Sequence, residues 1–436
     1  MHELHLVVLD TTAIQSYIFG SNRLRENVGA SHLVHMATSG WLLDSPNDYL
    51  PKGRHNIERG ERQDNLRIEK QEVDAELLYA GGGNTVLLFR DDEAVKRFGN
   101  HLSTKLHCEA PGIEVVMATE TFDWQGSLVD AMHRAMQKLS EAKRRREINE
   151  PILGLGVTAA CQSTGFPANI NYYEPGSAQE TGNWWTVASA VYAKQQQNSP
   201  AKRRLQKELT DYPGISDEDK ALFARHPFPD DFDDLGRTKG EESYIGVVHA
   251  DGNSIGQRLE QIAMQYKDFC GDQNREYIQQ LRTFSDQANR AGLAALRQVV
   301  TAVARWYDVE QQTLASPTSS NSEQFLPIRP IVFGGDDVTF VCDGRIALQA
   351  AQAFLVAFGQ QEILSEKAIA GAGVAIVKTH YPFARAYHLA EELTKNAKAE
   401  YKRAEPALDW HLAQSGLFGS LREIRRVEYS GPKGRT

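Results

Sequence analysis

The residues of this chain that could do chemistry are grouped in a short turn, Gly334-Gly335-Asp336-Asp337, between two apolar stretches. The apolar residues 330–333 and 338–341 predict a β-hairpin with this turn at its tip. Glycines allow a sharp turn and the close approach of a phosphate, and adjacent carboxylates are hard oxygen ligands of the kind that Mg²⁺ or Mn²⁺ requires. The pattern indicates a metal-binding hairpin for phosphoryl transfer. Taken alone, it also fits a hairpin turn without function.

A second acidic position lies upstream, where the apolar stretch 244–250 ends at Asp251 and continues into the turn Gly252-Asn253-Ser254. In a ferredoxin-like palm, a strand that ends in Asp lies antiparallel to a central hairpin, so we expect Asp251 to converge with Asp336 and Asp337. Three carboxylates at one edge repel one another unless metal lies between them. Two ions held in this way can activate a 3′-hydroxyl and neutralise a leaving pyrophosphate, so the predicted reaction is nucleotidyl transfer.

Together these motifs resemble the palm of the large polymerase-cyclase subunit of type III CRISPR effector complexes and, more distantly, the GGDEF cyclases. The resemblance is carried by residues 250–256, 334–337 and 390–398. It implies an α+β protein with two ferredoxin-like palm domains, each an antiparallel sheet flanked by helices, with ATP as substrate and two Mg²⁺ or Mn²⁺ ions. It also implies that a lysine of the last segment contacts the triphosphate. Lys398 is the matching residue and Lys395 the next candidate; by composition alone, Lys398 fits a solvent-exposed helix face.

The resemblance assigns further roles in the second palm. Asp251, Asp336 and Asp337 are the expected catalytic and metal-binding residues, and the Gly252 carbonyl is an additional candidate metal ligand. The residues expected to contact the nucleotide are Gly252, Asn253, Ser254, Gly334, Gly335, Lys395 and Lys398.

The first half of the chain repeats this layout. An apolar strand pattern at residues 4–9 ends at Asp10, and residues 77–89 have the strand-turn-strand form of the later hairpin, with Gly83-Asn84 in the place of Asp336-Asp337. Without the paired carboxylates, this hairpin is not expected to hold two metal ions. The first half resembles the catalytically degenerate first palm of the CRISPR subunit. The residues that this resemblance implies for an acceptor nucleotide are Asp10, Gly81, Gly82, Gly83 and Asn84. The alternative is that the first half only supports the second.

Composition limits the class of protein. With 436 residues, of which 41% are hydrophobic, the chain is long enough for two or three folded domains. No stretch approaches the roughly 20 apolar residues of a membrane span, and the N-terminal residues lack the features of a signal peptide. We therefore expect no membrane association and a cytoplasmic location. The four cysteines are far apart and form no zinc-ligand pair, so we expect them to be reduced.

The formal net charge of −9 argues against broad nucleic-acid binding. Two basic clusters, at residues 143–146 and 202–204, follow helical patterns and fit solvated helix ends better than phosphate contacts. The acidic residues 229–234 fit a solvated linker better than a cation site.

We predict four regions along the chain. These are a degenerate first palm at 1–200 with a polar surface loop at 44–74, an acidic polar linker at 201–242, a catalytic second palm at 243–404, and a C-terminal extension at 405–436. The expected helices are at 92–106, 125–146, 184–197, 257–266, 275–307, 345–358 and 382–403, and the expected strands include 112–120, 152–160, 368–377 and 410–412.

The leading hypothesis is a nucleotidyltransferase that condenses nucleoside triphosphates into a cyclic di- or oligonucleotide, which a downstream effector senses in antiviral defence. The chain contains no His-Asp dipeptide, so we expect a compact form without the nuclease domain of that family. Two alternatives stay open: a large subunit that is activated by RNA and assembles with CRISPR-type subunits, and a scaffold that binds nucleotide and metal without turnover. The sequence leaves open the base, the linkage, the ring size and whether the chain forms a homo-oligomer.

Overall fold

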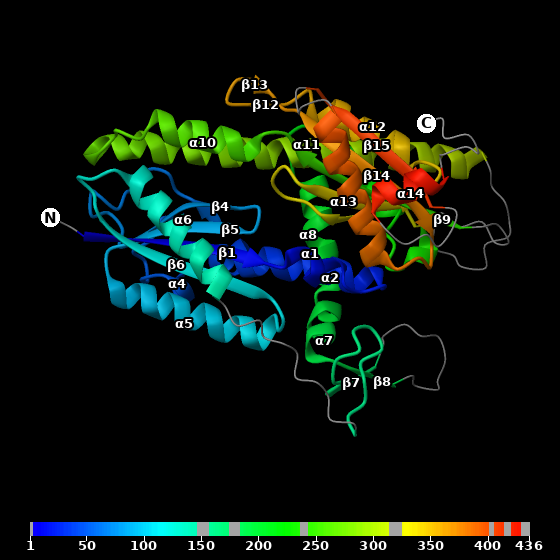
Figure 1. Ribbon diagram of the computed structural model, residues 1–436, viewed down its shortest axis with the longest axis horizontal. Helices are drawn as coiled ribbons and strands as arrows, with labels where there is room; N and C mark the ends of the chain where they lie inside the picture. The colour runs from blue at the N-terminus through cyan, green and yellow to red at the C-terminus, as the bar shows by residue number, and fades with distance from the viewer. Residues whose placement is uncertain are drawn as a thin grey trace. The chain divides into compact units, whose positions relative to one another are not determined.

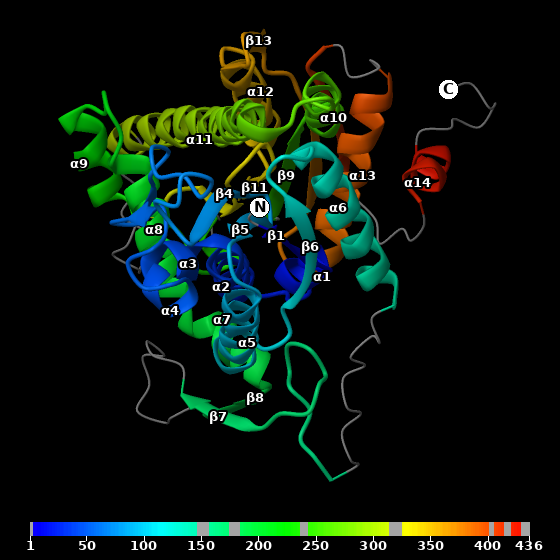
Figure 2. The same cartoon turned by 90° about the vertical axis from the view of Figure 1, so that its left-hand side faces the viewer.

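The computed structural model of the chain contains two compact units (Figures 1 and 2). The first comprises residues 1–21, 25–201 and 255–287, and the second comprises residues 22–24, 202–254 and 288–436. The structure describes residues 3–145, 157–173, 184–235, 243–313, 325–400, 405–413 and 420–428.

The first unit is built on a four-stranded antiparallel sheet with the strand order β4-β5-β1-β6. Its strands are β1 (Glu3–Thr12), β4 (Ala75–Gly81), β5 (Asn84–Phe89) and β6 (Glu114–Asp123). The helices α2 (Leu24–His35) and α5 (Asp92–Glu109) lie in the two crossovers of the chain, and α6 (Leu128–Arg145) packs against β6 and β1. Buried Val7, Leu87 and Phe98 belong to its core, which closes one face of the sheet.

The second unit has a five-stranded sheet with the order β10-β11-β9-β14-β15, in which only β15 runs parallel to its neighbour. Its strands are β9 (Tyr244–Gly252), β10 (Ile328–Val332), β11 (Val338–Asp343), β14 (Ala370–Lys378) and β15 (Ala407–Leu412).

Helices cover both faces of this second sheet. They are α12 (Ala347–Phe358) and α13 (Phe383–Glu400). A Cβ on Gly246 of β9 would meet Ala347 of α12, whereas the ring of His249 lies against Tyr387 of α13. Because side chains alternate along a strand, positions 246 and 249 face opposite sides of the sheet. The strand that ends at Asp251 is therefore buried between two helices.

The two units share one topology, which confirms the predicted fold of two ferredoxin-like palms. In each, the first strand of the unit lies between the second strand of a hairpin and the fourth strand. The two hairpins also share a bulge: the register shifts between Leu77 and Tyr79 in one and between Pro330 and Val332 in the other. Leu77 precedes Asn84 by seven residues, and Pro330 precedes Asp337 by seven, so the bulges occupy equivalent positions.

Most of the predicted helices and strands are present within a few residues of their expected bounds, but several predictions were wrong. Residues 184–197 contain the strand β8 (Trp184–Val187) before the helix α7 (Ser189–Gln196). The polar segment 44–74 is not one surface loop, because it contains the helix α4 (Pro46–Tyr49) and buries Tyr49, Leu50 and Ile57 in the core. The strand expected at 152–160 falls largely outside the described residues.

The predicted linker at 201–242 is folded over its described part, 201–235. It contains the end of α8 (Asn198–Thr210), then α9 (Asp217–Arg225) and a short 3₁₀ turn at Phe232–Asp234. Leu222, Phe223 and Phe232 are buried within it. The aromatic and aliphatic residues between the charges, rather than the charges, decide the structure of this segment. In the C-terminal extension the helix α14 (Leu421–Glu428) was not predicted.

The division between the units also differs from the predicted domain boundary at 243. The helix α10 (Ile255–Gln265) and residues 274–287 of α11 (Asn274–Thr313) belong to the first unit, and the rest of α11 belongs to the second. A buried cluster of charged residues explains why residues 274–287 belong to the first unit. Glu76 of β4 is fully buried and accepts hydrogen bonds from Arg275 Nη1 at 2.6 Å and Arg282 Nη2 at 2.8 Å.

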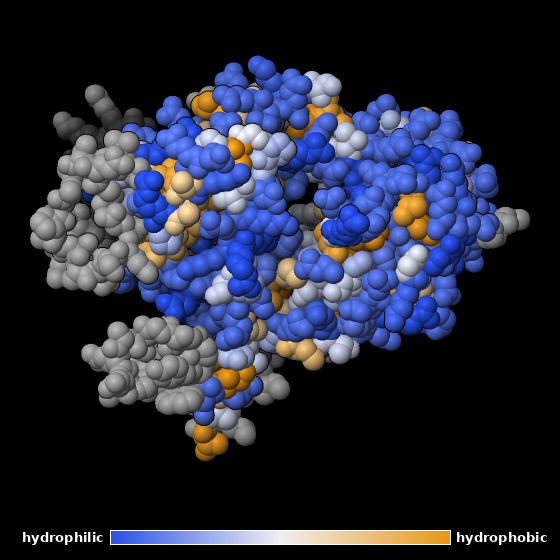
Figure 3. Space-filling view, turned by 180° about the vertical axis from the view of Figure 1, so that it is seen from behind, coloured by the Kyte–Doolittle hydropathy of each residue, from blue (hydrophilic) through white to orange (hydrophobic). Residues whose placement is uncertain are grey.

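On the face drawn in Figure 3, hydrophobic residues form small separate patches among hydrophilic ones. None of the helices that the structure describes combines the length and the apolar character needed to span a bilayer.

The buried cluster gives a first prediction. Glu76→Gln removes the buried negative charge that pairs with Arg275 and Arg282. The two buried guanidinium groups then have less negative charge beside them. We expect the free energy of unfolding, measured by urea denaturation, to fall by about 3–5 kcal/mol. The control Glu58→Gln changes a side chain that is 67% exposed, and it should change the free energy by less than about 0.5 kcal/mol. Equal effects of the two substitutions would contradict this role for Glu76.

Candidate functional site

The Gly-Gly-Asp-Asp turn joins β10 to β11 in the second unit, as the sequence predicted. Gly334 has φ 130° and Gly335 has φ 82°, backbone conformations that favour glycine over residues with a Cβ. Val338, the first residue of β11, pairs with Ala250 of β9. One step further along this antiparallel register, Asp337 lies opposite Asp251. The fold thus brings the predicted carboxylates to adjoining strand ends.

The pKa values of Asp336 and Asp337 are raised above the ordinary value of an aspartate. Burial, followed by the charge of Asp251, raises the pKa of Asp336 from an ordinary 3.8 to about 7. Burial and the charge of Asp251 also raise the pKa of Asp337, against the opposing effect of His249. A carboxyl group resists ionisation in this way where negative charge is crowded and poorly hydrated.

His249 of β9 is buried. Its Nδ1 atom lies 3.1 Å from Thr339 Oγ1 and 3.3 Å from Asp337 Oδ1. The imidazole of His249 therefore contacts the Asp337 carboxylate from β9, a contact that the sequence analysis did not anticipate.

Lys398 enters the site from α13. Its side chain is only 7% exposed; its Nζ atom forms an ion pair with Asp251 and donates a hydrogen bond of 2.9 Å to the Gly252 carbonyl. The close approach of α13 requires glycine on β14, because a Cβ at Gly371 would lie 2.6 Å from Lys398 Cγ. Lys395 points elsewhere: it pairs with Glu391 at 2.8 Å and is 67% exposed. The structure thus separates the two candidate lysines.

The turn after β9 contains the other predicted contacts of this unit. Asn253 is buried, and its backbone N–H donates to the Ile369 carbonyl at 2.7 Å. Ser254 has a left-handed backbone conformation with φ 61°. This turn places both residues directly after Asp251 and Gly252, at the same strand end.

Three residues that the sequence analysis did not select hold the Gly-Gly-Asp-Asp turn in place. Asn289 of α11 accepts a hydrogen bond from the Gly335 N–H at 2.9 Å. A Cβ at Gly292, one turn further along α11, would lie 2.1 Å from the Gly335 carbonyl oxygen. Arg204 of α8 donates to the Phe333 carbonyl at 3.2 Å and lies 4.3 Å from the centre of the Phe333 ring. Of these three residues, only Gly292 could have been found from the sequence, because a glycine in the middle of a long predicted helix indicates a close contact.

The first unit has a related but less acidic site. Asp10 of β1 lies opposite Asn84 of β5, and Gly82 and Gly83 of the turn have φ 59° and 85°. Gly81 ends β4 directly before them. With its amide nitrogen turned toward Asp10, Asn84 donates to both carboxylate oxygens, at 2.8 and 3.3 Å. A glycine turn and the Asp10 position thus have counterparts in the second unit, but the paired carboxylates do not occur here.

Lys143 of α6 forms an ion pair with Asp10. It is therefore not only part of a solvated helix end, as its basic sequence context suggested. Lys143 and Lys398 occupy comparable places, because each lies on the helix that follows the fourth strand of its palm and pairs with the Asp near the end of the first strand.

The donor set of the second unit fits a divalent cation. Three carboxylates and the Gly252 carbonyl are the hard oxygen ligands that Mg²⁺ or Mn²⁺ prefers, and the raised pKa of Asp336 reflects negative charge that a cation would offset. Among the described residues, no three His, Cys, Asp or Glu side chains already stand at metal-binding distances from one another. Lys398 provides the compensating positive charge at Asp251.

The fold and these strand-end sites place both units in the class of palm domains. Residues 244–407 match the family model described as Cas10/Cmr2, second palm domain. A search of curated protein sequences gave no match. Similar solved structures include the apo Csm1-Csm4 cassette, with 12% identity and a TM-score of 0.51 over 93% of this chain and 54% of that chain.

Two further structures of the Csm1-Csm4 cassette, in complex with pppApA and with cA4, match at 15% and 14% identity. Their TM-scores are 0.51 and 0.50, and each match covers 92% of this chain and 53% of that chain. The chain therefore spans about half the length of the solved chains that it matches. Its second unit matches the Cas10/Cmr2 second-palm model, and the fold of the chain is similar to that of solved chains of the Csm1-Csm4 cassette.

Because the carboxylates are crowded, replacing Asp336 by a neutral residue should stabilise the folded protein at high pH but not at low pH. Because the pKa of Asp336 is raised in the folded protein, its contribution to stability is full below about pH 4 and is lost as the pH rises through 7. Without metal, Asp336→Asn should therefore raise the Tm at pH 8 by roughly 2–4 °C and leave it unchanged at pH 4. The measurement is differential scanning fluorimetry in EDTA. The exposed control Asp268→Asn should shift neither value. A lower Tm for Asp336→Asn at pH 8 would disprove the repulsion.

Proposed function

We propose that the second unit is a nucleotidyltransferase that condenses ATP into a cyclic oligoadenylate. The observation that carries the proposal is the meeting of Asp251, Asp336 and Asp337 at adjoining strand ends, with Lys398 buried beside them. The Cas10/Cmr2 second-palm match covers this site. The similar Csm1-Csm4 structures, in complex with pppApA and cA4, support adenylate as the substrate class.

In the proposed reaction, the 3′-hydroxyl oxygen of one nucleotide attacks the α-phosphorus of another. The bond between that phosphorus and the bridging oxygen to the β-phosphate breaks, pyrophosphate leaves, and the hydroxyl proton is released. Asp251, Asp336, Asp337 and the Gly252 carbonyl would hold two Mg²⁺ or Mn²⁺ ions. When bound, such ions favour the ionised hydroxyl and neutralise charge on the leaving group.

The protein's own residues then position the triphosphate. The backbone at Gly334 and Gly335, which has no side chain to obstruct it, and the turn at Asn253 and Ser254 would approach the phosphate oxygens. Lys398, already fixed at Asp251 and the Gly252 carbonyl, would offset negative charge at the same strand end. A charge held in place before the reaction stabilises the transition state without the cost of reorganisation.

The first unit is proposed to hold a nucleotide without catalysing transfer. Its turn, Gly81 to Asn84, also contains two glycines with positive φ, and Asp10 and Lys143 supply one negative and one positive charge. Asn84 in place of a carboxylate leaves too few acidic ligands there for two ions.

An RNA-activated subunit of a type III CRISPR complex is the second candidate. It is favoured by the likeness to the Csm1-Csm4 cassettes, in which the matched fold occurs together with another subunit. A scaffold without turnover is the candidate from another class. Co-purification with RNA and CRISPR-type subunits would support the RNA-activated subunit. Nucleotide binding without product would support the scaffold.

The activity itself is tested with radiolabelled ATP and Mg²⁺ or Mn²⁺, with and without RNA, and with products identified by mass spectrometry. We expect a cyclic adenylate product from the native protein. Asp336→Ala/Asp337→Ala should reduce its rate at least about 100-fold, because the metal-binding oxygens are lost. The control Asp268→Ala removes an exposed carboxylate and should keep the native rate. Product formation at the native rate in the double variant would refute the assignment. Binding of ATP without product under all conditions would favour the scaffold.

The two lysines of α13 give a separate prediction. Lys398→Ala should lower kcat/KM by roughly 10–100-fold, since it removes a buried charge beside Asp251. Lys398→Arg should recover only part of the rate, because a guanidinium is larger than the ammonium group that Asp251 and the Gly252 carbonyl hold. Lys395→Ala is the matched control on the same helix and should stay within about twofold of the native value, because its side chain is exposed and paired with Glu391. The reverse order of effects would assign the nucleotide contact to Lys395.

A further inference from the structure

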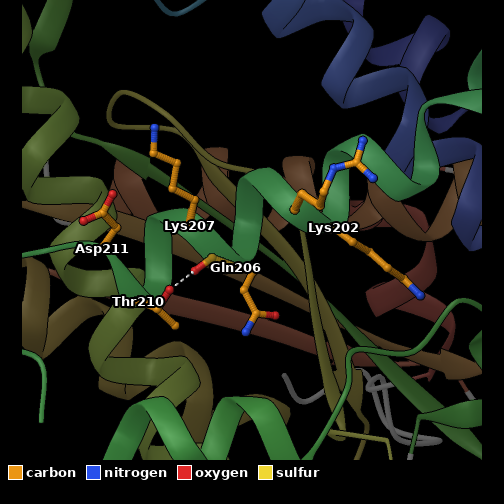
Figure 4. A pocket seen from close by; sticks show the side chains of 6 residues that line it. Lys202, Gln206, Lys207, Thr210 and Asp211 are labelled. Atoms are coloured by element: carbon orange, nitrogen blue, oxygen red, sulfur yellow. Dashed lines mark hydrogen bonds between the residues drawn. The ribbon is translucent and has the colours of Figure 1, made fainter. Parts of the chain in front are cut away.

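The helix α8 of the second unit carries a basic surface away from the acidic turn. An open hollow of about 530 Å³ lies along it, and the described residues that line it are Lys202, Arg203, Gln206, Lys207, Thr210 and Asp211. Figure 4 shows Lys202, Gln206 and Lys207 projecting from the helix. Three positive charges and one negative leave this lining at +2, in a chain whose formal net charge is −9.

The cations of this α8 surface are spaced for a ligand with several negative charges. Arg203 and Lys207 are four residues apart, so they share one side of the helix and lie about 6 Å apart along its axis. Both are exposed, and neither forms an ion pair with a described residue. Lys202, in contrast, is paired with Asp230. Arg203 and Lys207 are therefore the charges available to a ligand.

The side chains beside these cations add hydrogen-bonding capacity. Gln206 and Thr210 also line the hollow, and the Thr210 hydroxyl donates to the backbone carbonyl of Gln206 at 2.8 Å (Figure 4). Arginine, lysine and amide donors together suit phosphate oxygens, which accept several hydrogen bonds at once.

The same helix contacts the acidic turn. Arg204, next to Arg203, donates to the Phe333 carbonyl, and its guanidinium lies over the Phe333 ring. Phe333 directly precedes Gly334. A ligand that fixes α8 at Arg203 and Lys207 would therefore also fix the backbone from which the Gly-Gly-Asp-Asp turn begins.

We propose that the α8 surface is a second phosphate-binding site, which is separate from the carboxylate site and connected to its turn through Arg204. The ligand is a chain of phosphates, supplied either by the backbone of RNA or by a free polyphosphate. A chain of phosphates fits the spacing of Arg203 and Lys207 better than a single phosphate does, because both cations are then engaged together. The site is independent of whether the second unit catalyses nucleotidyl transfer.

Binding is tested in EDTA, which keeps metal-dependent nucleotide binding out of the measurement. Fluorescence anisotropy with a labelled 20-nucleotide RNA, and competition by inorganic triphosphate, distinguish the two sources. Arg203→Ala/Lys207→Ala should weaken RNA binding at least 10-fold. It should also lower the slope of log Kd against log salt by about 1.4, the value for two phosphate contacts on a single strand.

Two further variants keep this result interpretable. Arg203→Lys/Lys207→Arg preserves both charges and should bind RNA within about threefold of the native protein. Lys367→Ala/Arg422→Ala removes two exposed charges elsewhere in the same unit and should leave the affinity unchanged. Native affinity and salt slope in Arg203→Ala/Lys207→Ala would overturn the proposal, as would the absence of binding to both RNA and triphosphate. Binding of an acidic peptide alone would also overturn it, in favour of a protein partner.

The connection to the turn has its own test. Bound RNA should slow hydrogen exchange at residues 332–336 at least twofold in the native protein. Arg204→Met should retain RNA binding, because Arg203 and Lys207 are unchanged, but should lose the slower exchange. If exchange at the turn is the same with and without bound RNA in the native protein, α8 binds phosphate without influencing the turn, and the connection is refuted.

Discussion

The repulsion among three carboxylates is the constraint on which the second unit depends. Asp251, Asp336 and Asp337 lie at adjoining ends of β9 and β11, where burial and mutual charge raise the pKa of Asp336 and Asp337. Such a group is unfavourable unless positive charge is close to it. Lys398 supplies one positive charge, which is buried and held by Asp251 and the Gly252 carbonyl.

The surrounding structure keeps these opposing charges in one arrangement. Gly371 leaves space for Lys398 beneath α13, and Gly292 allows the turn to lie directly on α11. Asn289 and Arg204 bind the turn on either side of Gly334. Residues of α8 and α11, which are distant from the turn in the chain, therefore fix this loop of four residues. This frame holds the candidate ligands of a divalent cation at adjoining strand ends.

Comparison of the two units shows how little separates a metal site from its degenerate copy. Both have the same strand order, equivalent bulges and an ion pair between the Asp of the first strand and a Lys of a following helix. The difference lies at the turn, where Asn84 stands in place of Asp337. The amide of Asn84 can donate to Asp10, whereas Asp337 adds a further negative charge opposite Asp251. In the first site, Asn84 and Lys143 therefore balance the charge of Asp10, whereas the second site has an excess of negative charge.

The sequence by itself determined the hairpins, the strand ends and the repetition of one fold, because glycine turns and apolar strand patterns act over a few residues. It also indicated Asp251, Asp336 and Asp337 as one group, since the expected palm topology joins them. It could not show that residues 201–235 are folded, that Glu76 binds Arg275 and Arg282, or that Lys398 rather than Lys395 reaches Asp251. Only the tertiary structure decided these points, because they depend on contacts between residues far apart in the chain, which local patterns do not encode.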